Sequence, residues 1–151
     1  MGNSLDNKVE GKVEYLQMIQ GTIDRMSTSS AIFKGFTATI VAGVSALSFS
    51  DVNKWVLVLS FVPILCFAFL DIYYLRLERR YRYLYKQVRS NNHPVDYDLE
   101  APKVSAIKKA DKKTNTRFWT CVLSLSIQLF YFPMLVISII IVIMKFGGYL
   151  G

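Results

Sequence analysis

The sequence is poor in the residues that build active sites, metal sites and disulfide frameworks. His93 is its one histidine, and Cys66 and Cys121 are its two cysteines. No serine, cysteine or carboxylate stands at a recognisable catalytic spacing from His93, and no glycine-rich phosphate loop occurs. Both cysteines fall within apolar runs, where a thiol packs as a small hydrophobic group. We therefore expect no enzymatic activity, no catalytic residue, no cofactor and no metal site.

Three long apolar runs occupy much of the chain. Residues 31–49, 55–75 and 118–144 are each long enough to cross a bilayer as a helix, which takes about 20 residues. The first 30 residues include several acidic side chains, so they do not form the basic and then apolar leader of a cleaved signal peptide. The sequence predicts an all-α integral membrane protein with three transmembrane helices.

Positive charge is concentrated in one segment, which sets the expected orientation. Residues 76–117 hold twelve Lys and Arg against five acidic residues, and this excess of seven equals the net charge of the whole chain. The loop before the second span has Lys54 as its only basic residue, and the tail after the third span has only Lys145. The positive-inside rule then places the N-terminus and residues 76–117 in the cytoplasm and the C-terminus outside.

The N-terminal segment is expected to form a separate helix. A stripe of apolar residues at helical spacing predicts an amphipathic helix over residues 5–26, and its members are Val9, Val13, Leu16, Ile23 and Met26. We expect this helix to lie on the membrane or to pack between subunits. The polar run 27–30 then predicts a bend. Residues 1–30 are therefore a cytoplasmic arm, and residues 31–75 a transmembrane hairpin of two spans.

The second span is predicted to continue into the cytoplasm as one helix to about residue 89. Its apolar residues keep a helical spacing beyond the membrane. Residues 95–100 alternate apolar and acidic side chains, which suits an extended segment lying against the basic helix. Residues 103–117 are either a weak surface helix or a flexible linker. They complete the basic segment 76–117, and residues 118–151 are the third span with a short outer tail.

Small residues form a row along the first span. Gly35, Thr39 and Gly43 recur every four residues, a spacing that lets another helix approach closely. One interpretation is packing against the second span. The other is a subunit interface or a pore lining, in which the hydroxyls of Thr37, Thr39 and Ser45 face water.

Two ionisable residues lie within the predicted hairpin. Lys34 stands about one turn into the first span, and Asp71 about one turn before the end of the second, so an antiparallel hairpin places them at similar depth. Burying a charge in hydrocarbon costs roughly 2.5–3.5 kcal/mol, so such residues are candidate functional groups. They could form a structural ion pair, they could face a water-filled axis shared by several subunits, or Lys34 could extend its ammonium to the interface.

The third span carries polar groups in its predicted interior. Gln128 and Tyr131 lie near mid-depth beside Pro133. An amide or phenol in hydrocarbon is costly without a hydrogen-bond partner, so we expect both side chains to bond to a neighbouring helix.

The basic helix is a candidate binding surface. Its cations are Arg79, Arg80, Arg82, Lys86 and Arg89. The simplest interpretation is a topology signal with contacts to anionic lipid headgroups. The alternative is a surface that binds a nucleotide messenger, a nucleic acid or an acidic cytoplasmic protein, with Tyr81, Tyr83 and Tyr85 available for stacking. No specific nucleic-acid recognition is predicted.

Two stretches carry a resemblance to known proteins. The first runs through Met18-Ile19-Gln20, Ile23, Arg25-Met26, Ser30 and Lys34-Gly35-Phe36, and the second through Leu70-Asp71-Ile72-Tyr73-Tyr74-Leu75-Arg76, Glu78-Arg79 and Tyr81-Arg82-Tyr83-Leu84-Tyr85. Across residues 15–89 the chain resembles a widespread group of small bacterial membrane proteins with an arm, a hairpin and a basic helix. More loosely, the architecture is similar to SLATT effectors of bacterial antiphage defence, although the third span departs from their two-span plan.

The resemblance implies a function and a location. SLATT effectors are proposed to oligomerise and permeabilise the membrane. The chain is then expected to be a cyclic homo-oligomer in the bacterial inner membrane, an effector or channel that depolarises the membrane in antiphage defence. In this interpretation Lys34 and the first span line or gate the axis. The alternative is a non-conducting membrane anchor or accessory subunit that binds an acidic partner or anionic lipid.

The charge asymmetry makes a testable prediction about topology. A reporter enzyme that is active only outside the cytoplasm should be active when fused after Gly151 and inactive when inserted at Asn92. Reporter activities in the opposite order would contradict the three-span topology.

Overall fold

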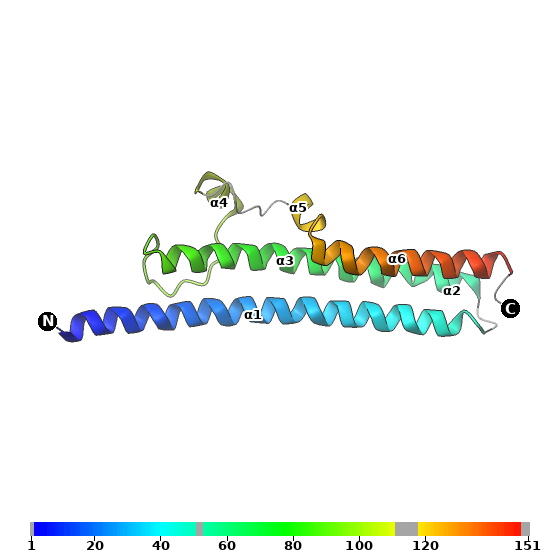
Figure 1. The fold of residues 1–151 in the computed structure, drawn as a ribbon, viewed down its shortest axis with the longest axis horizontal. Helices are drawn as coiled ribbons and strands as arrows, with labels where there is room; N and C mark the ends of the chain where they lie inside the picture. The colour runs from blue at the N-terminus through cyan, green and yellow to red at the C-terminus, as the bar shows by residue number, and fades with distance from the viewer. Residues whose placement is uncertain (1, 51–52, 111–117, 149–151) are drawn as a thin grey trace.

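Two long helices, α1 (Gly2–Leu47) and α3 (Phe61–Arg89), lie side by side along most of the molecule (Figure 1). The computed structural model describes residues 2–50, 53–110 and 118–148. The other helices are α2 (Lys54–Leu59), α4 (Val104–Ala110), α5 (Phe118–Val122) and α6 (Leu125–Phe146). Within the described residues all regular secondary structure is helical, which confirms the predicted all-α fold.

Three helical segments are long and apolar enough to cross a membrane. They are Asn7–Leu47 in α1, Lys54–Arg89 across α2 and α3, and Leu125–Phe146 in α6. At 1.5 Å per residue, α6 is about 33 Å long, close to the hydrocarbon thickness of about 30 Å. Most of each apolar stretch is exposed on the single chain, so lipid or another protein must cover it. The three predicted spans thus correspond to three candidate membrane-spanning helices, which supports a membrane protein.

α1 is continuous, and the bend predicted at residues 27–30 is wrong. Two hydroxyls, one before this run and one within it, donate hydrogen bonds to carbonyls of the preceding helical turn. Thr22 Oγ1 donates to the Met18 carbonyl at 3.0 Å, and Ser29 Oγ donates to the Arg25 carbonyl at 3.0 Å. Hydroxyls bonded in this way do not compete with the helix for its own N–H groups. The arm and the first span are therefore one helix.

The second span is interrupted near its start. Pro63 has no N–H to give to the Leu59 carbonyl, and its ring crowds that carbonyl. α2 accordingly ends at Leu59 and α3 begins at Phe61, while Ser60 Oγ donates to the Leu57 carbonyl at 2.6 Å. The single helix predicted from residue 55 is thus two helices. From Phe61 the chain continues unbroken to Arg89, as its apolar spacing predicts.

The third predicted span is also two helices. α5 turns away from α6, with the extended residue Ser124 between them (Figure 1). Cys121 of α5 is buried in a cluster with Ile72 of α3 and Tyr131 of α6. The membrane-length helix therefore starts at Leu125, which places Gln128 in its first turn instead of at mid-depth.

Beyond the spans, the first half of α1 packs against the second half of α3. We call this pair, residues 7–29 and 72–89, the stalk. Its buried apolar cluster contains Tyr15, Ile19 and Ile23 from α1 and Leu84 and Val88 from α3. Most of the apolar stripe of the arm is therefore buried against α3. Over this buried length, the expectation that the stripe lies on the membrane or between subunits is wrong.

Residues 94–103 form a strap across the stalk. The Tyr81 hydroxyl donates to the Leu99 carbonyl at 2.8 Å, and the Arg80 guanidinium donates to the carbonyls of Ala101 and Pro102 at 2.7 and 2.8 Å. The strap is not helical and lies against the basic helix, as its sequence pattern predicts. Of the two alternatives for residues 103–117, a helix is found at Val104–Ala110. Residues 111–117 lie outside the described part of the chain.

Tyr97 fixes the strap to α1. Its φ of +58° lies in the left-handed region, which is unusual for a bulky residue. Its ring centroid is 5.6 Å from that of Tyr15, and its hydroxyl lies 3.3 Å from Glu14 Oε2. Gly11 leaves room for the Tyr97 hydroxyl, because a Cβ at position 11 would lie 2.9 Å from it.

Enlarging Gly11 should release the strap. Gly11→Val places methyl groups where the Tyr97 hydroxyl lies, so chymotrypsin should cut after Tyr97 several-fold faster than in wild type. Gly21→Val is the matched control, since a Cβ at Gly21 meets nothing within 4 Å and the loss of glycine from the helix is the same. Equal cleavage rates for the two variants would contradict this role of Gly11.

Candidate functional site

A charged pair lies where the three candidate spans meet. Lys34 Nζ on α1 is 3.1 Å from Asp71 Oδ2 on α3. The Asp71 side chain is fully buried, whereas the Lys34 side chain is 21% exposed. Within the described part of the chain Asp71 Oδ2 accepts no hydrogen bond, so it is held by the charge of the ammonium group. The structure brings these two residues together, as the hairpin geometry predicts.

Hydroxyl groups complete the surroundings of the pair. Ser30 Oγ donates to Asp71 Oδ1, and Lys34 Nζ donates to Ser30 Oγ at 2.8 Å and to Ser126 Oγ at 3.3 Å. Ser126 is the second residue of α6, so the cluster joins α1, α3 and α6. A buried ion pair is stable only when further hydrogen bonds satisfy its remaining groups. No sequence pattern assigned Ser30 or Ser126 to this pair, because Ser30 belongs to a polar run that predicted a bend and a single serine such as Ser126 is common in spans.

The pair lies near one end of the transmembrane layer. At the other end of α6, Lys145 Nζ donates to the Ser50 carbonyl at 2.8 Å in the loop after α1. Polar contacts therefore join the helices at both ends of α6, with apolar packing between them. Tyr131 takes part in this packing, since it is buried and its hydroxyl lies 3.4 Å from the Phe67 carbonyl. Tyr131 thus has the interhelical partner that was predicted.

Gln128 does not have the buried position that the sequence predicts for it. Its side chain is exposed on the single chain, one turn into α6. The single chain leaves this side chain uncovered, and its hydrogen bond to a neighbouring helix stays a prediction.

The small-residue face of α1, formed by Gly35, Thr39 and Gly43, points away from the rest of the chain. All three residues are exposed, and a Cβ added at either glycine meets no atom within 4 Å. The interpretation that this row packs against the second span is therefore wrong. Thr37 and Val41 are buried instead.

The hydroxyls proposed to face water are already bonded. Those of Thr37, Thr39 and Ser45 donate to the carbonyls of Phe33, Gly35 and Val41 at 2.9, 3.0 and 2.7 Å. Such bonds to the preceding turn satisfy a hydroxyl inside an apolar layer. Their hydroxyls therefore do not require a water-filled pore.

The predicted cations Arg79, Arg80 and Arg82 of the basic helix make contacts within the chain. Arg80 holds the strap, Arg82 pairs with Glu78 at 2.7 Å, and Arg79 lies 3.4 Å from the Thr120 carbonyl. Lys86 and Arg89 are exposed farther along α3. Arg89 is 18 residues beyond Asp71, which at 1.5 Å per residue is about 27 Å. A headgroup layer is only about 5–8 Å thick, so Arg79 fits the lipid interpretation better than Arg89 does.

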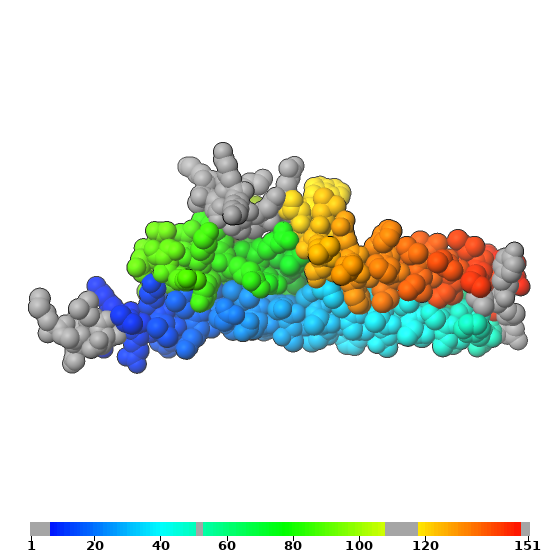
Figure 2. Space-filling view, viewed as in Figure 1, coloured from blue at the N-terminus to red at the C-terminus, as the bar shows by residue number. Residues whose placement is uncertain are grey.

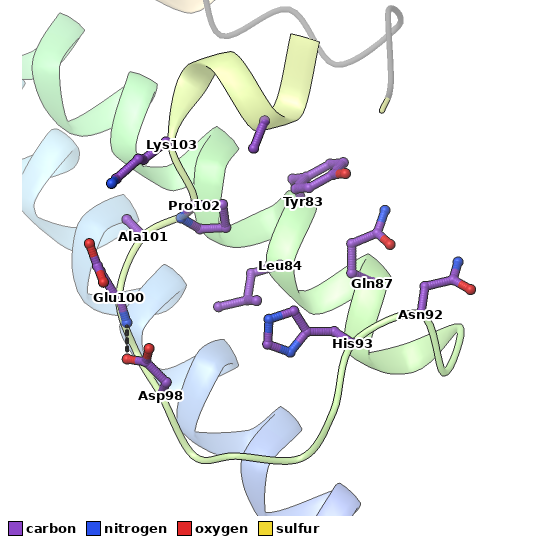
Figure 3. Close-up of a pocket in the computed structure, with 11 residues that line it drawn as sticks. Tyr83, Leu84, Gln87, Asn92, His93, Asp98, Glu100, Ala101, Pro102 and Lys103 are labelled. Atoms are coloured by element: carbon purple, nitrogen blue, oxygen red, sulfur yellow. Dashed lines mark hydrogen bonds between the residues drawn. The ribbon is translucent and has the colours of Figure 1, made fainter. Parts of the chain in front are cut away.

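A pocket of about 440 Å³ lies between α3, the strap and α4 (Figure 3). Its wall includes Leu84, His93, the cation Lys103 and the two carboxylates of Asp98 and Glu100. The strap is anionic: the Asp98 N–H donates to Asp96 Oδ1 at 3.1 Å and lowers the pKa of that carboxyl below its usual range. The predicted arginines do not line this pocket. It is therefore poorly suited to the phosphates of a nucleotide messenger.

The described residues contain no group of three His, Cys, Asp or Glu side chains that could hold a metal ion. His93 lies at the pocket with its Nδ1 2.9 Å from the Pro94 carbonyl.

Comparisons with protein-family models, with curated proteins and with solved structures find no match for this chain.

Breaking the ion pair should destabilise the protein strongly. Lys34→Ala leaves the buried Asp71 carboxylate without its counter-charge, which typically costs about 3–5 kcal/mol. Asp71→Asn in the same background should restore part of the loss. Thermal unfolding of the purified variants in detergent measures both effects. Lys103→Ala, at an exposed lysine, is the control. If Lys34→Ala instead left the stability unchanged and altered ion flux, Lys34 would face a water-filled axis.

Proposed function

We propose that this chain is a homo-oligomeric membrane effector whose subunits associate through the small-residue face of α1. The assembled protein permeabilises or depolarises the bacterial inner membrane, with the stalk in the cytoplasm and the C-terminus outside. Antiphage defence is the setting that the similarity to SLATT effectors suggests. The observation that supports the proposal is the exposure of Gly35, Thr39 and Gly43 inside an apolar span.

The choice of glycine at these positions favours a partner outside the chain. Glycine costs roughly 1 kcal/mol relative to alanine in a helix interior. No atom of the described chain would collide with a Cβ at Gly35 or Gly43, so intramolecular packing does not require glycine there. In a bilayer, small residues allow two helix backbones to approach and gain dispersion contacts that lipid does not supply. A second copy of α1 is the partner that this face suits.

A ring of such contacts would also place Lys34 beside the subunit interface. Lys34 precedes Gly35 directly, and part of its side chain is exposed. In a cyclic assembly the Lys34–Asp71 pairs would then form a ring of paired charges at one end of the transmembrane layer. Rings of charged groups at a pore mouth set the local potential for permeating ions.

A second candidate is a non-conducting anchor or accessory subunit. The close pairing of Lys34 with Asp71 favours it, because the carboxylate offsets the cation that would otherwise line the axis. In this case the stalk binds an acidic protein or anionic lipid, and the membrane part only holds it in place.

The two candidates are separated by adding bulk to the α1 face. Gly43→Leu should prevent close approach of the helices and lower the oligomer mass measured for protein in detergent or nanodiscs. It should also abolish depolarisation of cells that overproduce the protein, as followed with a potential-sensitive dye. Cys66→Leu is the control, because Cys66 is also a small exposed residue within a candidate span.

The outcomes are distinct. A monomeric wild-type protein over a wide concentration range would refute self-association. An oligomeric wild type that never depolarises the membrane would favour the anchor.

A further inference from the structure

The stalk has a free end at which α1 extends beyond α3. Lys12 Nζ donates to the Arg89 carbonyl at 2.9 Å and to Asn91 Oδ1 at 2.6 Å, so α3 ends level with Lys12. α1 begins ten residues earlier, at Gly2, and thus projects about 15 Å farther at 1.5 Å per residue. Figure 1 shows this overhang at the blue end of α1, and in Figure 2 the blue residues of α1 reach past the green end of α3.

A groove of about 490 Å³ lies at this end, between α1 and the end of α3. Its apolar part is Val9, Val13 and Leu16, and the side chains of Val9 and Val13 are 64% and 49% exposed. Its remaining lining residues are Lys8, Lys12, Arg89 and Asn91. The groove is therefore an apolar strip bordered by cations, on a part of the chain that is too polar to enter a membrane.

The membrane that holds the chain cannot cover this groove. Val9 lies 25 residues before Lys34 on one continuous helix, a distance of about 38 Å. That is several times the headgroup thickness of about 5–8 Å.

A second copy in the same membrane is also a poor fit. The stalks of two copies in one membrane would be parallel. A symmetric contact through this groove would then place Lys8 and Arg89 of one copy near the same cations of the other. Like charges facing each other across an interface oppose association.

We infer that the groove is a docking site for an acidic amphipathic helix of a partner protein. The apolar side chains of such a helix, spaced three and four residues apart, would lie on Val9 and Val13, and its carboxylates would face Lys8 and Arg89. The site is separate from the small-residue face of α1 and does not depend on the proposed self-association. It also assigns acidic-partner recognition to the tip of the stalk instead of to the arginines near the membrane.

The test uses the full-length protein in nanodiscs of neutral lipid. The probe is a fluorescent helical peptide with leucines at three- and four-residue spacing and glutamates elsewhere, and the reference peptide carries lysines in place of the glutamates. Fluorescence anisotropy should show that the acidic peptide binds at least about tenfold more tightly. Val13→Glu should weaken its binding by about tenfold, and a Lys8→Glu, Arg89→Glu double variant should reverse the preference.

Two control variants test whether the effect is local. Met18 is another exposed apolar residue of α1, and Lys103 is another exposed cation. Met18→Glu and Lys103→Glu should leave the affinity of the acidic peptide within about twofold of wild type, because neither residue lines the groove.

Several results would overturn the inference. The groove would not be a docking site for an acidic helix if both peptides bound equally or if neither bound. The same would follow if the control variants lost as much affinity as the groove variants. A lower oligomer mass for Val13→Glu would show contact between copies, and capture of the nanodiscs by separate anionic vesicles in preference to the peptide would show a second membrane.

Discussion

The buried carboxylate of Asp71 is the constraint around which the transmembrane part is arranged. A charge without solvent is tolerated only when counter-charge and hydrogen-bond donors surround it, and here they come from different helices. Lys34 and Ser30 on α1 supply the counter-charge and a hydroxyl, while Ser126 connects α6 to the same ammonium group. Moving any of the three helices would separate groups that this carboxylate and its counter-charge need.

The continuity of α1 connects this site to the rest of the molecule. The same helix carries Lys34 in the transmembrane layer and Tyr15, Ile19 and Ile23 in the stalk. A partner that tilts or rotates the stalk would therefore act directly on the helix that holds the ion pair and displays the small-residue face. This gives a physical route from an event outside the membrane to the arrangement of subunits within it, and it needs only a helix that remains unbroken through residues 27–30.

The residues of the basic helix show why a charge cluster does not specify a single role. Arg80 donates to carbonyls of the strap, and Arg82 pairs with Glu78. The Glu78–Arg82 pair has the four-residue spacing of a helical ion pair, which is a local pattern. The contacts of Arg80 with Ala101 and Pro102 join residues far apart in the sequence, and no local pattern indicates them. The pocket beside the strap arises in the same way, because α3, residues 92–103 and α4 come together only after the chain turns back at Asn91.

The sequence by itself determined the helical class, three candidate spans, the extension of α3 to Arg89 and the similar depth of Lys34 and Asp71. These follow from length, hydropathy and helical periodicity, which are local properties, and from the antiparallel geometry of a short hairpin. Only the tertiary structure decided that α1 continues through its polar run, that Gly35 and Gly43 face outward, and that Gln128 lies exposed in the first turn of α6. A helix has many faces that satisfy the same periodicity, and the side that becomes buried is chosen by packing between distant parts of the chain.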